Sequence, residues 1–159
     1  MQTKEEQWIK GFWEEPIMIF EEILNKRALG VFATIDENKP KTRVLQALWT
    51  EGNKIFFSTG AQKPTFQQIE KNPHVSFCIE NKYSPVISFS GEVKVIDNIE
   101  YKERAFKMLP PIVRKIYDEK ASHPLFKVFY IEVKQIRAFS YKEGLKEYEI
   151  DDNGNEKLQ

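Results

Sequence analysis

The sequence is poor in the residues that form disulfides and metal sites. It contains one cysteine, Cys78, and two histidines, His74 and His123, among 159 residues. A single cysteine excludes an internal disulfide, and two distant histidines without further ligands at metal-binding spacing argue against a zinc site. We therefore expect neither a disulfide framework nor a metal centre.

Long apolar runs and an excess of one charge are also missing. No stretch of about 18 apolar residues occurs, and the N-terminal region lacks the apolar core of a secretion signal. Lysine plus arginine equals aspartate plus glutamate at 24 each. A balanced chain has no overall field that attracts nucleic acid or an anionic membrane. We expect a soluble cytoplasmic protein that binds neither, and any anion site must be local.

Aromatic residues are plentiful, with 12 phenylalanines, six tyrosines and three tryptophans. Many lie in short apolar runs between turn-forming residues, a pattern typical of antiparallel strands. Thr42–Trp49 is largely apolar on both faces, so we expect it to be covered on both sides. Gly91 indicates a bulge or bend that helps the sheet close. The expected strands are 28–35, 42–49, 55–58, 75–79, 86–96, 126–133 and 136–141.

The remaining segments favour helices or loops. Strands joined by short turns favour antiparallel pairing, and about seven strands with burial on both sides favour closure into a barrel. We predict one mainly β domain over 1–159, an antiparallel barrel with peripheral α-helices. Its other parts are an N-terminal helical segment 1–27 with helices around Trp8 and after Pro16, a helix 64–71 opened by Pro64, a helical insertion 98–118 capped by Asp97 or Asn98, and a polar tail 149–159.

The densest group of polar residues spans the second strand, the end of the third and the next helix. If these two strands pair as a hairpin, Arg43 lies beside two hydroxyl residues, and Lys63 precedes a helix whose first N–H groups are free. Such donors suit a phosphate. The same residues are compatible with a surface ion pair, turn capping and a solvated lysine. The group comprises Arg43, Ser58, Thr59, Lys63 and Gln68.

Several segments occur in an order that is more specific than any one of them. In this order, over about Leu29 to Val95, they resemble the pyridoxamine 5'-phosphate oxidase-like family of FMN-binding split barrels. The segments are Val31–Asp36, Pro40–Leu45, Lys54–Thr59, Lys63 and Gln68–Phe77.

The resemblance implies an antiparallel split β-barrel that forms a homodimer with two FMN sites at the subunit interface. It further implies which residues hold the cofactor. Residues matching Arg43, Ser58 or Thr59, Lys63 and Gln68 would grip the phosphate, and backbone around Val44, Leu45 and Phe57 would line the ribityl chain and flavin ring.

Two features depart from the family's pattern. Many relatives carry a small hydroxyl residue two positions before the lysine, where this chain has Ala61. Either Ser58, Thr59 or Thr65 replaces that phosphate donor, or the affinity is low. The arginine-rich substrate motif of the true pyridoxamine phosphate oxidases is not recognisable around 136–148, so we do not expect that reaction.

The function that follows from the resemblance is a flavin-dependent oxidoreductase. FMN would take electrons from a reduced nicotinamide or similar donor and pass them to a small acceptor, neither of which the sequence specifies. No side chain is a persuasive acid or base, so no catalytic residue is assigned. One alternative is a module that holds FMN, a deazaflavin or haem without turnover. Another is a barrel that stacks single-stranded nucleic acid, against which the neutral charge argues.

Overall fold

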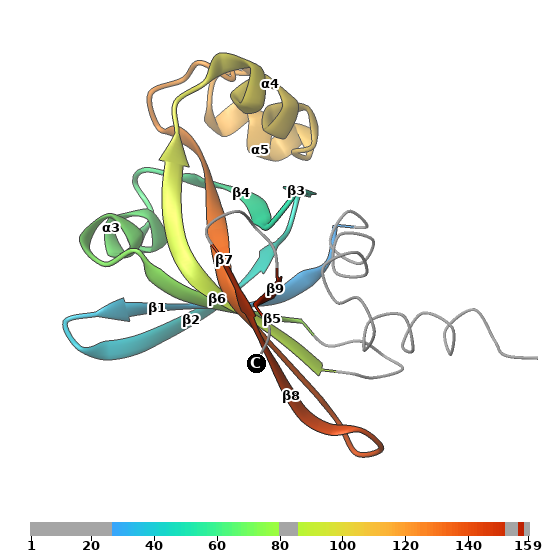
Figure 1. Ribbon diagram of the computed structural model, residues 1–159. Helices are drawn as coiled ribbons and strands as arrows, with labels where there is room; N and C mark the ends of the chain where they lie inside the picture. The colour runs from blue at the N-terminus through green and yellow to red at the C-terminus, as the bar shows by residue number, and fades with distance from the viewer. Residues whose placement is uncertain (1–26, 80–85, 152–155, 158–159) are drawn as a thin grey trace, which may run out of the picture.

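The computed structural model describes residues 27–79, 86–151 and 156–157 (Figure 1). The helices expected around Trp8 and after Pro16 lie outside these residues. The described strands form one antiparallel sheet. They are β1 (Leu29–Asp36), β2 (Lys39–Gln46), β3 (Trp49–Glu51), β4 (Lys54–Gly60), β5 (His74–Ile79), β6 (Val86–Ile96), β7 (Phe126–Ser140), β8 (Gly144–Ile150) and β9 (Glu156–Lys157).

The sheet curls around a core without closing. Neighbouring strands follow the order β2-β1-β5-β6-β7-β4-β3, with β8 paired to β7 and β9 to β8. Within the described residues, β2 pairs with β1 alone, and β4 beyond Phe56 pairs with β7 alone. Two strand edges, Lys39–Gln46 and 57–60, are therefore free. The expected antiparallel, mainly β fold is confirmed as a split barrel, while full closure of the sheet is not observed.

The inner face of the sheet is packed with phenylalanine rings. The Phe32 ring on β1 lies 5.3 Å from that of Phe57 on β4 and 5.7 Å from that of Phe129 on β7, measured between centroids. The helix α3 (Pro64–Lys71) adds Phe66 and Ile69 to this cluster. Because these side chains leave water together, the core holds β1 and β4 on opposite sides of one interior.

A second core lies on the other side of β4. Phe56 stacks on Trp49 there, and Phe106 and Phe126 join the same cluster. It lies under the helical insertion, which contains α4 (Ile99–Lys107) and α5 (Pro111–Ile116). Figure 1 shows these helices at the opposite end of the molecule from the β7–β8 hairpin.

Several local predictions are confirmed. Helix α3 begins at Pro64 and ends at Lys71, and β6 has the expected bounds. The Asn98 side chain caps α4 by accepting a hydrogen bond from the Glu100 backbone N–H at 2.9 Å. The β6–β7 register shifts between Ser90 and Gly91, so the expected bulge is present.

The prediction for the second strand is wrong in its bounds, its pairing and its burial. The strand ends at Gln46, and Trp49 starts the separate strand β3. It pairs with β1 and not with the strand that follows it, because β4 pairs with β3 and β7. As the edge of an open sheet, β2 has one face turned outward, and Val44 is 63% exposed.

The C-terminal predictions also need correction. The two closing strands expected over 126–141 are one strand, β7, which runs without a break through Lys134 and Gln135. The tail expected from residue 149 instead includes the end of β8 and the whole of β9. The many charged residues of β8 obscure the alternation of apolar and polar residues by which a strand is predicted. The described sheet thus has nine strands where about seven were expected.

Candidate functional site at the split

Arg43 is held by a network of buried polar groups. It lies opposite Phe32 in the β1–β2 register, so its side chain is on the inner side of the sheet. Its Nη1 donates to Thr34 Oγ1 at 2.7 Å and to the Phe32 carbonyl at 3.2 Å, and its Nη2 donates to Gln68 Oε1 at 2.5 Å. These contacts fix the guanidinium between β1, β2 and α3.

Thr34 links the other two members of this network. Its hydroxyl donates to Gln68 Oε1 at 2.6 Å, and both residues are buried. The Gln68 carbonyl oxygen thus faces Arg43 and Thr34, which turns its amide NH₂ away from them. Burial lowers the pKa of Arg43, yet a guanidinium keeps its charge in proteins.

The Arg43 network leaves donors unused. Of the five N–H groups of a guanidinium, the three contacts above use two on Nη1 and one on Nη2. The Nε–H and one Nη2–H of Arg43 therefore have no partner in the described part of the chain, and the same holds for the NH₂ group of Gln68. A rigid cation with free donors is suited to bind an anion.

Ser58, Thr59 and Lys63 lie at the end of β4 and the start of α3. Because strand side chains alternate, Thr59 is on the inner side with Phe57, and Ser58 is on the opposite side. Lys63 is exposed at the N-cap of α3, and its backbone N–H donates to the Gly60 carbonyl at 3.0 Å. Within the described residues, none of these three side chains forms a hydrogen bond or ion pair.

The structure thus brings some of the expected site residues into contact and leaves others apart. Arg43 and Gln68 touch directly. Ser58 and Thr59 are not on a strand paired with β2, so the expected hairpin does not place them beside Arg43. The connection runs through α3, which begins after Lys63 and carries Gln68.

Three further residues were expected to line the cofactor through their backbone. Val44 and Leu45 lie on the free edge strand β2, and Phe57 lies where the free edge of β4 begins. The Phe57 side chain is buried in the core, so its backbone is the part that remains for a ligand. A free strand edge has unpaired N–H and C=O groups that can form hydrogen bonds to a ligand.

Thr34, the central residue of the Arg43 network, was not expected from the sequence. The sequence does contain a signal, because Thr34 alternates onto the same face as Phe32 in a largely apolar strand; the structure shows that it is 2% exposed. A buried hydroxyl needs a partner, which points to a polar contact across the strand.

At the position of the missing hydroxyl, two positions before Lys63, Ala61 packs against the core, and Thr65 is buried on α3.

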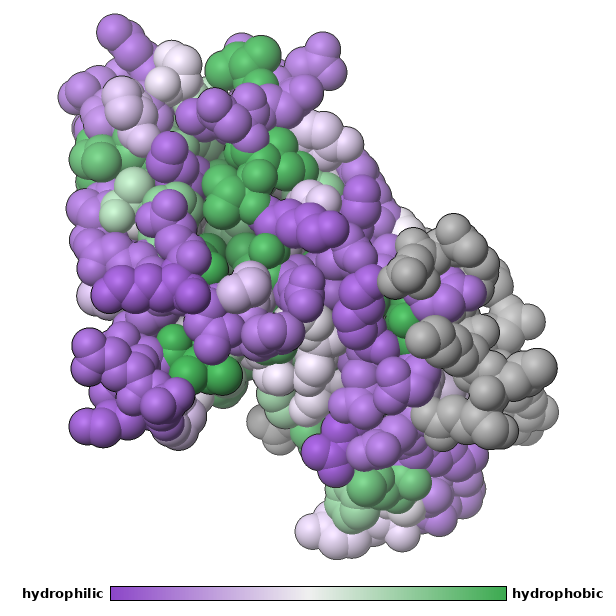
Figure 2. Space-filling model, turned by 60° about the vertical axis from the view of Figure 1, so that its left-hand side comes forward, coloured by the Kyte–Doolittle hydropathy of each residue, from purple (hydrophilic) through white to green (hydrophobic). Residues whose placement is uncertain are grey.

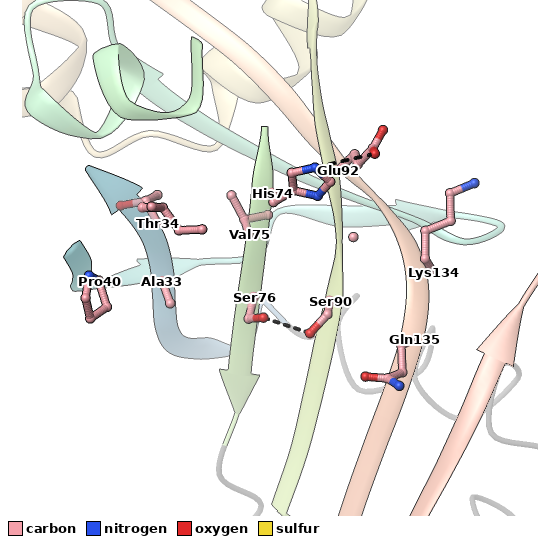
Figure 3. Close-up of a pocket in the computed structure, with 12 residues that line it drawn as sticks. Ala33, Thr34, Pro40, His74, Val75, Ser76, Ser90, Glu92, Lys134 and Gln135 are labelled. Atoms are coloured by element: carbon pink, nitrogen blue, oxygen red, sulfur yellow. Dashed lines mark hydrogen bonds and ion pairs between the residues drawn. The ribbon is translucent and has the colours of Figure 1, made fainter. Parts of the chain in front are cut away.

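A separate groove of about 490 Å³ lies on the outer face of the sheet (Figure 3). The Ser76 and Ser90 hydroxyls share a hydrogen bond of 2.7 Å in it, and His74 Nε2 lies 3.9 Å from Glu92 Oε1. None of the expected cofactor residues lines this groove. It is lined by Ala33, Thr34, Ile35, Pro40, His74, Val75, Ser76, Ser90, Gly91, Glu92, Lys134 and Gln135.

The described residues contain neither a metal-binding cluster nor a membrane-spanning helix. They contain no group of three or more histidine, cysteine, aspartate or glutamate side chains placed to hold a metal ion. None of the helices α3, α4 and α5 is long and apolar enough to cross a membrane.

The curled antiparallel sheet, with its two free edges and flanking helices, defines a split-barrel protein. The family model described as pyridoxamine 5'-phosphate oxidase matches residues 20–140, and the chain belongs to this family. No curated protein gives a significant match to the sequence.

Solved structures share this fold at low sequence identity. A NimC/NimA family protein from Clostridium acetobutylicum is 23% identical, with a TM-score of 0.69 over 87% of this chain and 97% of the other. A pyridoxamine 5'-phosphate oxidase-related, FMN-binding protein from Nostoc punctiforme is 17% identical, with a TM-score of 0.65 over 93% of both chains. A heme-binding protein from Mycobacterium smegmatis is 14% identical, with a TM-score of 0.62 over 81% and 57%.

Proposed function

We propose that this protein binds FMN at the split between β2 and β4 and acts as a flavin-dependent oxidoreductase on a small molecule. The observation that carries the proposal is the Arg43 network. A buried threonine and a buried glutamine fix the guanidinium while two of its N–H groups have no partner in the described residues. A guanidinium that is already held in one position can bind an anion without losing further side-chain freedom.

The neighbouring residues fit the anionic end of FMN. Lys63 adds a second positive charge at the start of α3, where the first backbone N–H groups lack intrahelical partners. Thr59 lies on the inner side of β4 and Ser58 on its outer side, near the end of the strand that precedes α3. The phosphate would be bound by these residues together with Arg43 and Gln68.

The remainder of the cofactor would lie along the two free edges. The backbone of Val44 and Leu45 on β2, and of Phe57 on β4, would contact the ribityl chain and the ring. When bound, FMN supplies the electron transfer, and the protein supplies its placement and polarity. No side chain described at the split is placed as an acid or base, so the oxidoreductase reaction would rest on the cofactor.

A second function is a carrier or sensor that holds its cofactor without turnover. The observation in its favour is the same absence of an acid or base among the described residues at the split. The heme-binding protein from Mycobacterium smegmatis shows that the same fold occurs in a protein with another cofactor. FMN is the better match here because the free donors of Arg43 and Lys63 suit a phosphate.

We further propose that the protein is a homodimer formed through the outer face of the sheet. Val31 and Val44 are opposite each other in the register, and Val86, Phe139 and Leu145 form a second cross-strand row on the same face. All five are between 41% and 63% exposed. Exposed apolar patches of this kind are typical of protein interfaces. Figure 2 shows hydrophobic residues on the protruding hairpin.

The cofactor proposal is tested by absorption spectra and by titration of the purified protein with FMN. Lys63→Ala removes a charged contact worth about 1.5 to 3 kcal/mol, so FMN affinity should fall about tenfold or more. Lys71→Ala is the matched control, because Lys71 lies exposed in the last turn of the same helix. It should leave the affinity unchanged.

Three results would count against the proposal. Equal FMN affinity of the Lys63→Ala and Lys71→Ala proteins would remove Lys63 from the site. A protein that takes up haem and ignores FMN would favour the second function. Bound FMN that no reduced nicotinamide bleaches under anaerobic conditions would favour a carrier over an oxidoreductase that uses this donor.

A further inference from the structure

Tyr117, which follows α5, lies buried against the end of β4. It is 3% exposed, and its ring packs on Phe126 and His123 at centroid distances of 5.3 Å and 5.8 Å. Its hydroxyl lies against Gly60, because a Cβ built on Gly60 would be 2.6 Å from Tyr117 Oη. The phenol is therefore fixed in position by the ring contacts and directed at the last residue of β4.

The segment between α5 and β7, which begins with Tyr117, is hydrogen-bonded to the turn between β4 and α3. The Ala61 backbone N–H donates to the Leu125 carbonyl at 2.8 Å, and the Lys63 N–H donates to the Gly60 carbonyl at 3.0 Å. These bonds place the Tyr117 hydroxyl at the base of the turn that carries Lys63. The helical insertion thus reaches the candidate phosphate site from the outer side of β4.

The Tyr117 hydroxyl forms no hydrogen bond in the part of the chain that the structure describes. The buried side-chain polar atoms without a partner among the described residues are Arg27 Nε and Trp49 Nε1, so the unpaired Tyr117 oxygen keeps contact with solvent and can be reached by a ligand. Ser58 lies on the same side of β4 as Gly60, and its hydroxyl is also without a partner among the described residues. Two hydroxyls are therefore available on this side of the turn.

We propose that Tyr117 is a further residue of the anion site, whose hydroxyl donates a hydrogen bond to the phosphate monoester that Lys63 binds. This inference rests on the proposed binding of FMN and extends the site to the helical insertion. It also explains why residue 60 is glycine, since a side chain there would displace the hydroxyl.

The test compares Tyr117→Phe with Tyr101→Phe in titrations with FMN and with riboflavin, which lacks the phosphate. Tyr101 is the matched control. It lies on α4, away from the turn, and its hydroxyl donates to Glu51 Oε2 at 2.9 Å. We expect Tyr117→Phe to weaken FMN binding about tenfold, as for one lost hydrogen bond to a charged group, and to leave riboflavin binding unchanged. Tyr101→Phe should change neither.

A second pair of variants tests the position of the hydroxyl. Gly60→Ala places a methyl group against Tyr117 Oη and the exposed Gln62 side chain, which can move aside. FMN affinity should therefore fall in Gly60→Ala. If the loss comes from displacing the hydroxyl, Gly60→Ala should weaken FMN binding less in the Tyr117→Phe protein than in the wild type.

The outcomes separate this inference from the proposed function. Equal FMN affinity of Tyr117→Phe and wild type, or equal loss of FMN and riboflavin binding, would overturn the role of Tyr117 and leave the Lys63 site standing. Failure of the wild-type protein to bind FMN would overturn the proposed function and this inference with it.

Discussion

At the scale of single residues, Glu132 on β7 is held by two lysines. Lys134 Nζ lies 2.6 Å from Oε1, and Lys94 Nζ lies 2.9 Å from Oε2. The hydrogen bonds from Lys134 and Lys94 lower the pKa of Glu132 from 4.5 to about 2. In the unfolded chain these contacts are lost, so the carboxylate binds a proton more readily there than in the folded protein.

The depressed pKa of Glu132 predicts a specific acid sensitivity. Its contribution to stability is present above pH 4.5 and is lost as the pH falls from there toward 2. The free energy of unfolding of the wild type should therefore fall more steeply in this range than that of Glu132→Gln, measured by urea denaturation across pH. The exposed Glu143→Gln is the control and should follow the wild type. Parallel curves for wild type and Glu132→Gln would contradict the prediction.

At the scale of elements, the β6–β7 bulge depends on a close approach of two backbones. A Cβ at Gly91 would collide with the Glu132 carbonyl oxygen and the Val133 Cα, which are backbone atoms and cannot rotate away. The register shift beside Gly91 lets the long strand β7 continue from the β4 pairing into the β8 hairpin.

Gly91→Ala should consequently be severely destabilising. Forcing a methyl group into this contact should lower the free energy of unfolding by about 3 kcal/mol, the upper end of the usual cost of overpacking. Gly52→Ala is the control, because Gly52 has a positive φ of 57° but nothing within 4 Å of an added Cβ. It should cost only about 1 kcal/mol of backbone strain. Similar unfolding midpoints in urea would refute the special role of Gly91.

At the scale of the whole molecule, the open sheet has two unlike faces. The inner face carries the phenylalanine core, and the outer face carries exposed valines, Phe139 and Leu145. The helices α3, α4 and α5 belong to other surfaces, since α3 adds to the inner core and the insertion packs beside β4. A second copy of the chain that covers the outer face would bury these residues and bring two splits into one assembly.

The proposed homodimer is tested by placing a charge on this face. Val31→Lys should convert the dimer into a monomer in analytical ultracentrifugation, because an unpaired ammonium would be buried at the interface. Ile112→Lys is the control, since Ile112 is 76% exposed on α5, away from the outer face. It should leave the mass unchanged, and circular dichroism should show both variants folded. A monomeric wild type, or a dimeric Val31→Lys protein, would exclude this interface.

The local elements could be predicted from the sequence, and so could the contact chemistry of Arg43 and Gln68. Pro64, Asn98 and Gly91 act through their own covalent geometry or their nearest neighbours, so the start of α3, the cap of α4 and the bulge were all expected. Arg43 and Gln68 were named because their side chains are donors that suit a phosphate, and the structure joins them by a hydrogen bond.

The strand pairing and the surroundings of the site were decided by the tertiary structure. Strand β4 pairs with β7, which begins 66 residues after Gly60 in the sequence, and hydropathy alternation contains no information on such distant partners. The placement of Thr34 under Arg43, and of Tyr117 against Gly60, depends on this pairing. Which residues are available to bind an anion follows from the sequence alone, since donor chemistry belongs to the side chain. Only the folded sheet decided which of them meet, because long-range contacts arise from packing.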